Sequence, residues 1–275
     1  MSHSVDASPL GQKTAYISSY DASLLFPIAR NEPRNTLGIS ADLPFYGYDM
    51  WTGYELSWLN AKGKPVVAVA EFKFPCSSPF IVESKSFKLY LNSFNQTRFA
   101  SLNDVLNILQ KDLSAVVGMT IEINLQNLGD STLLIDATYD ALCLDGLDID
   151  TDTYHPDSFL LTADASQEVD EVLSSHLLKS NCPVTGQPDW ASLFVEYSGA
   201  KIDHENLLRY VISFREHQDF HEHCVERIFV DVLRACKPKK LSVYARYTRR
   251  GGLDINPFRS TEIAMQPRVG RLLRQ

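Results

Sequence analysis

The stretch SNCPVTGQPDW, residues 180–190, contains the side chains best suited to covalent chemistry. Cys182 stands among polar neighbours, and Asp189 follows it seven residues later. A thiolate in an accessible loop is a strong nucleophile, and a nearby carboxyl group can give or take a proton. The alternative is that Cys182 is buried as a small apolar side chain, a common fate of free cysteine. The residues alone leave both interpretations open.

Two further motifs carry groups suited to a heterocyclic ligand. Phe220, His221 and Glu222 offer an aromatic ring, an imidazole and a carboxylate, which could stack on a purine-like ring and accept its N–H groups. Glu83 and Lys85 offer an acid for a base edge and a cation for a phosphate. The structural alternative for ESK is a solvated strand end. The structural alternative for FHE is a helix start, where His221 caps the helix and the helix dipole favours the negative charge of Glu222.

A third motif, RRGG at 249–252, could hold a phosphate through its arginines and backbone N–H groups, or form an ordinary hairpin tip. Metal sites have little support, because His221 and His223 are two residues apart and would point to different faces of a helix. The sequence contains no HExxH, GxGxxG, Walker A or GxSxG motif. We therefore expect no metal and no Rossmann or P-loop cofactor site.

Composition narrows the class of protein. The chain has 275 residues, of which 44% are hydrophobic and 22% charged, as in a globular protein with a sizeable core. Its net charge of −8 argues against nonspecific nucleic-acid binding and favours a small-molecule partner. We expect a cytoplasmic protein without a membrane partner, because no signal peptide and no long apolar run is evident. Five cysteines without a CxxC indicate neither a disulfide framework nor a zinc knuckle.

The two halves of the chain match weakly but without gaps at a shift of 120 residues, which predicts a tandem duplication. The aligned identities are Tyr90 with Tyr210, Ser93 with Ser213, Phe94 with Phe214, Val105 with Val225, Ile108 with Ile228 and Leu113 with Leu233. The motifs are not duplicated: ESK belongs to the first half, whereas Cys182 and FHE belong to the second. If both halves serve one pocket, each has kept a different part of it.

The repeat guides the prediction of elements. Alternating apolar and polar residues predict a strand over 203–215, and its repeat partner predicts another over 82–94. Helical spacing of apolar residues follows over 102–113 and 225–233. Ser101 is the expected N-cap of the first helix. A further strand in each half comes next.

Turns complete the predicted organisation. AKGKP at 61–65 predicts a hairpin, the Cys182 loop is its counterpart between two strands, and RRGG predicts another hairpin. Each half is then an antiparallel sheet with helices on one face. We place the connection between the halves at about 130–165 and expect one module over 1–140 and a second over 141–275.

Four motifs in order make the sequence similar to a known family. ESKSFKLY, CPVTGQPDW, DFHEHCVERI and RRGGLDINP resemble the NADPH-dependent 7-cyano-7-deazaguanine reductases, the nitrile reductases of queuosine biosynthesis. The resemblance extends over nearly the whole chain and matches the two-module form. It implies an α+β fold of tandem tunnelling-fold (T-fold) modules, with antiparallel sheets and helices on one face.

The resemblance also implies a mechanism. Cys182 would add to the nitrile carbon and form a covalent thioimidate, while Asp189 supplies a proton. Reduction by two NADPH in turn would give 7-aminomethyl-7-deazaguanine. The remaining roles implied are substrate binding by Val82, Glu83, Ser84, Phe220, His221 and Glu222, and NADPH binding by Ser84, Lys85, Arg250 and Gly251.

The family resemblance implies a homodimer, because tunnelling folds assemble through sheet edges. Two rival functions remain open. One is a tunnelling-fold cyclohydrolase acting on GTP, with Cys182, His221 or His223 and Cys224 around zinc, and the other is a noncatalytic purine-binding module. Cys224 lies four residues after Phe220, so a reversible disulfide between Cys182 and Cys224 is a further hypothesis.

Overall fold

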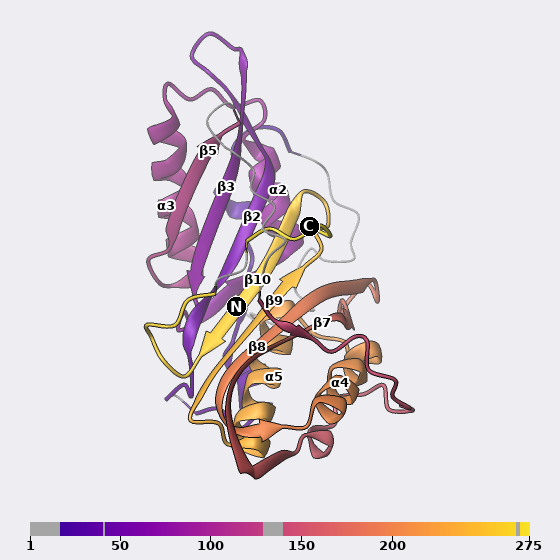
Figure 1. The fold of residues 1–275 in the computed structure, drawn as a ribbon. Helices are drawn as coiled ribbons and strands as arrows, with labels where there is room; N and C mark the ends of the chain where they lie inside the picture. Colours follow the sequence, from indigo (N-terminus) through magenta and orange to yellow (C-terminus); the bar gives the residue numbers. More distant parts are fainter. Residues whose placement is uncertain (1–16, 41, 129–139, 268–269) are drawn as a thin grey trace. The chain divides into compact units, whose positions relative to one another are not determined.

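A computed structural model of the protein describes residues 17–40, 42–128, 140–267 and 270–275. Runs of strands are separated by helices along these residues (Figure 1). The strands are β1 (Pro27–Ala29), β2 (Tyr46–Leu59), β3 (Pro65–Pro75), β4 (Phe80–Val82), β5 (Glu122–Asn127), β6 (Leu142–Cys143), β7 (Ala163–Asn181), β8 (Pro188–Ile202), β9 (Lys240–Tyr247) and β10 (Leu253–Ser260). The α-helices are α1 (Asn31–Thr36), α2 (Ser84–Ser93), α3 (Leu102–Val117), α4 (His204–Ser213) and α5 (His221–Cys236). The short 3-10 helices are η2 (Ala22–Leu24), η3 (Ser158–Leu160) and η4 (Phe214–Glu216).

The chain divides into two compact units, each built from several segments. Of the described residues, unit 1 contains 17–35, 49–128 and 249–254, and unit 2 contains the remainder. Strands β2 and β10 each contribute residues to both units. Residues 129–139, within the predicted connection, lie outside the described residues. The predicted modules 1–140 and 141–275 stay a prediction.

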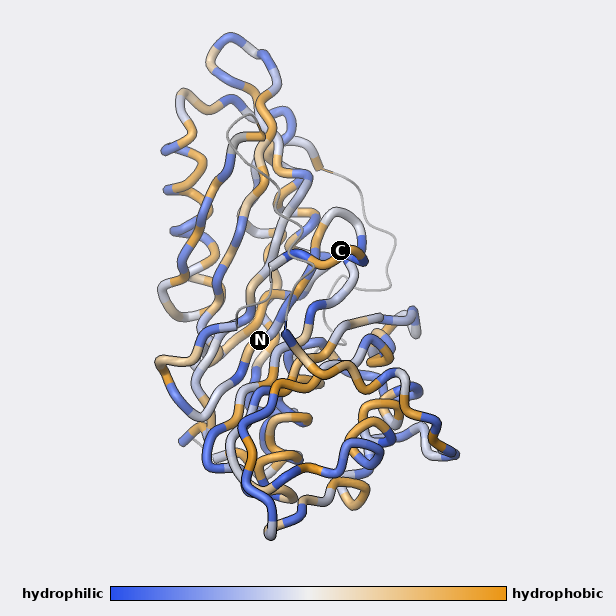
Figure 2. The backbone as a smooth tube through the Cα atoms, viewed as in Figure 1, coloured by the Kyte–Doolittle hydropathy of each residue, from blue (hydrophilic) through white to orange (hydrophobic). Residues whose placement is uncertain are grey.

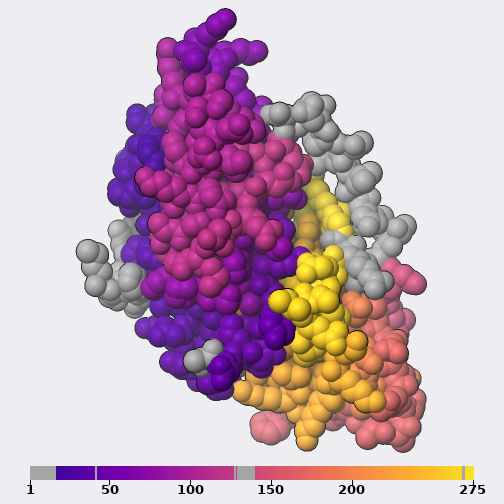
Figure 3. Space-filling model, turned by 90° about the vertical axis from the view of Figure 1, so that its left-hand side faces the viewer, coloured from indigo at the N-terminus to yellow at the C-terminus, as the bar shows by residue number. Residues whose placement is uncertain are grey.

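Unit 1 has the strand order β5-β3-β2, with β3 and β5 antiparallel. The predicted AKGKP turn joins β2 to β3, where the Asn60 N–H donates to the Lys64 carbonyl at 2.9 Å. Helix α3 begins at a capping box between Ser101 and Asp104, as its sequence predicts. It ends at Gly118, whose φ of +75° suits glycine. Figure 3 shows the residues around α3 and β5, coloured magenta, on the surface of this unit.

Unit 2 has the strand order β10-β9-β8-β7-β6. Neighbouring strands are antiparallel except for β6 and β7, which are parallel. The strands curve around α4 and α5 (Figure 1), and apolar stretches of both helices and of the strands make up the core between them (Figure 2). The α+β fold class expected from the sequence, with antiparallel sheets and helices packed on them, is confirmed.

The predicted strands over 82–94 and 203–215 are wrong: both segments are helices, α2 and α4. Glu83 and Asp203 cap them, each accepting backbone N–H groups of the first turn. The apolar residues that suggested a period of two include buried neighbours in sequence, such as Leu207 with Leu208 and Tyr210 with Val211. Burial of adjacent residues does not by itself identify a helix, because strands covered on both faces, such as β9 and β10, also bury neighbours. The capping acids before each segment are the clearer helical signal.

The repeat itself recurs in matching contacts within each unit. The Tyr90 hydroxyl donates to Asp112 at 2.8 Å in unit 1, and the Tyr210 hydroxyl donates to Asp231 at 2.8 Å in unit 2. Each tyrosine carbonyl accepts the hydroxyl of the serine three residues later at 2.6 Å. Helices α2 and α4 keep the shift of 120 residues between their bounds. The residues predicted to correspond therefore play corresponding structural roles.

No helix among the described residues is both long and apolar enough to cross a membrane.

Candidate active site

The turn between β7 and β8 carries Cys182 and confirms that this loop connects two strands. The Cys182 N–H donates to the Gln187 carbonyl at 2.8 Å, and the Gly186 N–H donates to the Cys182 carbonyl at 3.1 Å. Gly186 has a φ of +66°, a backbone conformation that would be strained for a residue with a side chain. Cys182 is 5% exposed, so the thiol lies in a tight, enclosed turn. It is a buried cysteine in a polar setting, which combines features of both interpretations of its sequence.

Asp189 lies in β8 of the same hairpin. It pairs directly with Ser180 of β7, so these two side chains lie on one face, and Cys182 follows the last residue of β7 in the turn. Asp189 is also buried, at 4% exposed. The structure thus places both residues, buried, on one hairpin, and their roles as nucleophile and acid stay predictions.

His221 completes this group from the first turn of α5. Its Nε2 lies 3.3 Å from Asp189 Oδ1, and its ring stacks on Tyr247 with centroids 3.7 Å apart and parallel planes. Phe220 is the N-cap residue, without a side-chain capping bond, so His221 does not cap the helix. Glu222 is buried in the same turn, where the helix dipole favours its charge.

Tyr247 and Cys224 belong to the same cluster, although Tyr247 has no signal in the sequence. Tyr247 is fully buried at the end of β9. Burial raises the pKa of the Cys224 thiol well above its ordinary value, and the negative charges of Asp219 and Asp189 raise it further. Cys224 is therefore held as a neutral thiol close to Asp189. All five cysteines are free thiols in this structure, and the Cys182–Cys224 disulfide stays a prediction.

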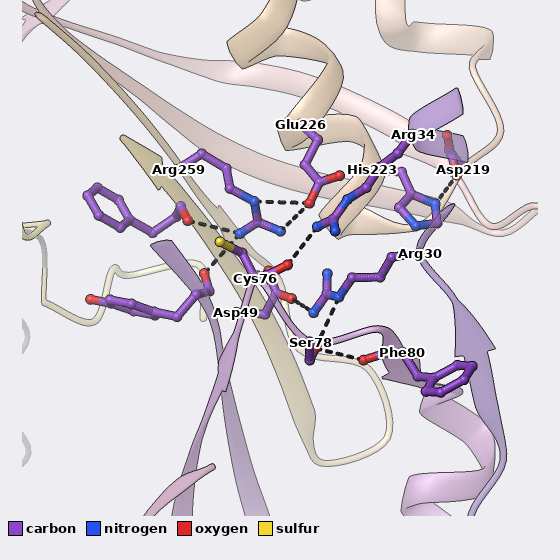
Figure 4. A network of polar contacts seen from close by, with 12 residues as sticks. Arg30, Arg34, Asp49, Cys76, Ser78, Phe80, Asp219, His223, Glu226 and Arg259 are labelled. Atoms are coloured by element: carbon purple, nitrogen blue, oxygen red, sulfur yellow. Dashed lines mark hydrogen bonds and ion pairs between the residues drawn. The ribbon is translucent and has the colours of Figure 1, made fainter. Parts of the chain in front are cut away.

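Asp219 anchors the entrance to α5. Burial alone would raise the pKa of Asp219, but hydrogen bonds from His217 and His223 and from the Phe220 N–H outweigh it and hold the pKa well below its usual range. His223 Nδ1 lies 3.0 Å from Asp219 Oδ1 (Figure 4). His221 and His223 thus serve different acids, as their spacing predicts.

In unit 1, Val82 ends β4 and Glu83 caps α2, followed by Ser84 and Lys85 in the first turn. Both carboxylate oxygens of Glu83 accept backbone N–H groups, from Lys85 and Ser86, at 2.7 Å. Burial nevertheless raises the pKa of Glu83 above its ordinary value. Glu83 is a buried helix cap rather than a solvated strand end.

The turn between β9 and β10 confirms the predicted hairpin. Gly251 and Gly252 have φ of +57° and +70°, and Arg250 pairs with Leu253 across the turn. A side chain at Gly251 would meet the aliphatic stem of Lys88 from α2 at about 3.5 Å. This hairpin tip therefore lies beside the helix that carries Ser84 and Lys85.

A group of side chains of the types that bind metals occurs elsewhere in the described residues. Cys143, Asp145 and His176 bring their ligand atoms within 4.8 Å of one another. Cys182, His221 and Cys224 do not form such a group there.

Two family profiles match the chain. One, described as "Nitrile reductase, 7-cyano-7-deazaguanine-reductase N-term", matches residues 16–125, and another, described as "QueF-like protein", matches residues 188–266. A protein named NADPH-dependent 7-cyano-7-deazaguanine reductase from Paraburkholderia phytofirmans is 58% identical over 98% of this chain and 99% of its own length. The chain belongs to this family. A Burkholderia vietnamiensis relative of the same name is also 58% identical, over 98% of each chain.

A solved structure described as the archaeosine synthase QueF-Like in the apo form also matches part of the chain. It is 22% identical, with a TM-score of 0.31, and its match covers 35% of this chain and 95% of that one. Family membership rests on the reductases, and it places the chain among oxidoreductases of the nitrile reductase type.

Proposed function

We propose that this protein uses NADPH to reduce the nitrile of 7-cyano-7-deazaguanine to 7-aminomethyl-7-deazaguanine, in the biosynthesis of queuosine in tRNA. Its relatives carry the name of this reductase over nearly the full length of the chain. The observation that carries the proposal is the group in unit 2, where the β7–β8 hairpin carries both Cys182 and Asp189, each buried, and His221 lies against Asp189.

The proposed first step is addition of Cys182 to the substrate. The Cys182 thiol gives its proton to the Asp189 carboxylate as its sulfur forms a bond to the nitrile carbon, and Asp189 passes that proton to the nitrile nitrogen, which gives a covalent thioimidate. A nitrile is a poor acceptor of hydride, so this adduct divides one difficult step into easier ones. The near-complete burial of Cys182 and Asp189 would exclude the water that hydrolyses an imine.

The remaining residues of unit 2 would hold the substrate. Glu222 would accept the N–H groups of the deazaguanine edge, with Phe220 and His221 enclosing the ring. Tyr247 keeps the His221 imidazole parallel to its own ring and directs Nε2 toward Asp189. In unit 1, Val82, Glu83 and Ser84 would take part in substrate binding.

NADPH, when bound, supplies hydride for two successive two-electron reductions, so that two NADPH are used in each turnover. Ser84, Lys85, Arg250 and Gly251 fit a phosphate-bearing ligand, because the hairpin tip lies beside α2 and both carry cationic side chains. Glu83 already accepts the first N–H groups of α2. The phosphate contacts would therefore come from side chains and the hairpin rather than from the helix N-terminus.

We also propose that the protein acts as a homodimer in the cytoplasm. The strand orders end at β5 in unit 1 and at β6 in unit 2, and edge strands are the elements that pair between chains. Light scattering coupled to size exclusion would give the mass of the assembly, and a monomeric mass at working concentrations would refute the dimer.

The covalent step is tested by intact mass after mixing the protein with 7-cyano-7-deazaguanine in the absence of NADPH. We expect the mass of one substrate added to the wild type and to Cys143→Ser, an exposed-cysteine control, and none added to Cys182→Ala. A wild-type protein that stays unmodified at saturating substrate would refute the thioimidate. Cys182→Ala should also lose turnover, whereas a noncatalytic binding module would be little affected.

Asp189→Asn tests the proton donor separately. We expect adduct formation to slow by about 10²–10⁴-fold, the usual contribution of a positioned acid. Substrate binding by Cys182→Ala, measured calorimetrically with and without Asp189→Asn, controls for loss of binding. A cyclohydrolase is excluded if GTP is not turned over and chelation leaves nitrile reduction intact.

A further inference from the structure

Cys143, Asp145 and His176 form a group of three different metal-ligand types in unit 2. Cys143 ends β6, Asp145 follows in the adjoining turn, and His176 lies in β7, against which β6 pairs in parallel. The Sγ, carboxylate and imidazole ligand atoms lie within 4.8 Å of one another. Ligands of a tetrahedral zinc ion are separated by about 3.3–3.8 Å, from bond lengths of about 2.0–2.3 Å. A shift of about 1 Å in the exposed Cys143 and His176 side chains would close the site.

Hydrogen bonds already orient two of the three ligands. Asp145 accepts the Ser175 hydroxyl at 2.7 Å and the His176 backbone N–H at 2.9 Å. His176 Nδ1 lies 2.8 Å from the Ser192 hydroxyl, which holds the ring. Metal-binding histidines and carboxylates are usually held by such outer contacts, because these fix the ring and the tautomer.

The backbone of β7 departs from regular pairing at this place. The register with β8 shifts between Ser175 and Leu178, and His176 lies within that irregularity. A bulge re-aims the side chain it carries and is frequent beside functional sites. Here the irregular stretch contains the exposed His176, which lies near Asp145, and regular pairing resumes at Leu178.

We propose that Cys143, Asp145 and His176 bind one divalent transition-metal ion of the zinc class, with water in the remaining position. A thiolate and an imidazole select zinc or cobalt over magnesium and calcium. The ion would fasten β6 to the irregular part of β7, which leads into the Cys182 turn six residues later. This site is separate from Cys182 and Asp189, and its existence does not depend on the proposed function.

Cobalt is the direct probe, since a thiolate ligand gives Co²⁺ a charge-transfer absorption that aqueous Co²⁺ lacks. The full-length Cys182→Ala protein is titrated with Co²⁺, so that the proposed nucleophile is not a ligand. We expect one equivalent to bind with this absorption. Cys143→Ser in the same background should lose the absorption, and His176→Gln should weaken binding at least tenfold. His155→Gln, which changes another exposed histidine of unit 2, is the matched control and should bind as the parent.

Zinc protection of Cys143 is an independent readout. Cys143 is the exposed member of the five cysteines, so iodoacetamide should modify it first, and Zn²⁺ should slow that reaction in the wild type but not in His176→Gln. The proposal is refuted if folded protein binds Co²⁺ without the absorption, or if the absorption persists in Cys143→Ser. If Cys143→Ser no longer binds zinc but still reduces the nitrile, the zinc of the wild type belongs to this site and not to a cyclohydrolase centre.

Discussion

The buried ion pair between Arg259 of β10 and Glu226 of α5 offers a quantitative test of what holds unit 2 together (Figure 4). The Arg259 Nε and Nη2 donate to Glu226 Oε1 at 3.1 and 2.8 Å. Nη1 donates to the carbonyls of Tyr48 and Phe258 at 3.1 and 2.9 Å. The side chains are 0% and 1% exposed. One guanidinium thus joins β10, the start of β2 and α5.

Glu226→Gln removes the negative charge and keeps the shape. Opposite charges about 4 Å apart attract by about 4 kcal/mol at an effective dielectric constant of 20. Breaking a buried pair on one side costs about 3–5 kcal/mol, because the other charge is left buried. The substituted side chain would still offer an amide oxygen to Arg259, so we expect the lower end, about 3 kcal/mol of unfolding free energy.

Urea unfolding, followed by far-ultraviolet circular dichroism and by tryptophan fluorescence, measures this loss. With a slope of about 3 kcal/mol per molar, the midpoint should fall by about 1 M, provided that both probes give the same transition. Glu216→Gln is the control, since its partner His155 and Glu216 itself are exposed, and it should change stability by less than about 0.5 kcal/mol. Replacing the pair together, by Glu226→Leu with Arg259→Met, should recover part of the loss but not all, because two backbone carbonyls lose their donor. A cost below about 1 kcal/mol for Glu226→Gln would refute the reasoning.

Three other perturbations test the structure. Tyr210→Phe should lower unfolding free energy by about 2 kcal/mol in urea melts, because it removes a buried hydrogen bond to the Asp231 carboxylate. The pKa of Asp219 is lower in the folded protein than in the unfolded chain, so the Asp219 carboxylate stabilises the fold above its unfolded pKa of about 4, and this stabilisation is lost as the pH falls below that value. Asp219→Asn should therefore flatten the acid limb of a curve of unfolding free energy against pH. An unchanged limb would contradict this assignment. Gly47→Ala should lower the unfolding free energy by about 2–4 kcal/mol and with it the melting temperature, because Gly47 has a φ of +141° and the added Cβ would collide with the Phe258 carbonyl oxygen. A melting temperature within error of the wild type would refute the close approach.

The repeat could be predicted from the sequence, but the type of its first element could not. The aligned Tyr, Ser and Phe of 90–94 and 210–214 make the same hydrogen bonds and ring contacts in each unit, so their register was reliable. The strand prediction failed because α2 and α4 are short and packed on several sides, which brings apolar residues next to one another and hides the helical period. The overlooked signal was an acid, Glu83 or Asp203, immediately before each apolar run, in the position of an N-cap.

Local spacing explains why part of the candidate site was predictable. Cys182 and Asp189 belong to one hairpin, so their short separation in sequence already indicates that they lie near one another. The stacking of Tyr247 on His221 joins the end of β9 to the start of α5 and depends on how the curved sheet packs on that helix. No local pattern encodes such a contact, because Tyr247 reads in sequence as an ordinary buried strand residue. The same reason hides the Cys143 group, whose members meet only through the parallel pairing of β6 with an irregular stretch of β7.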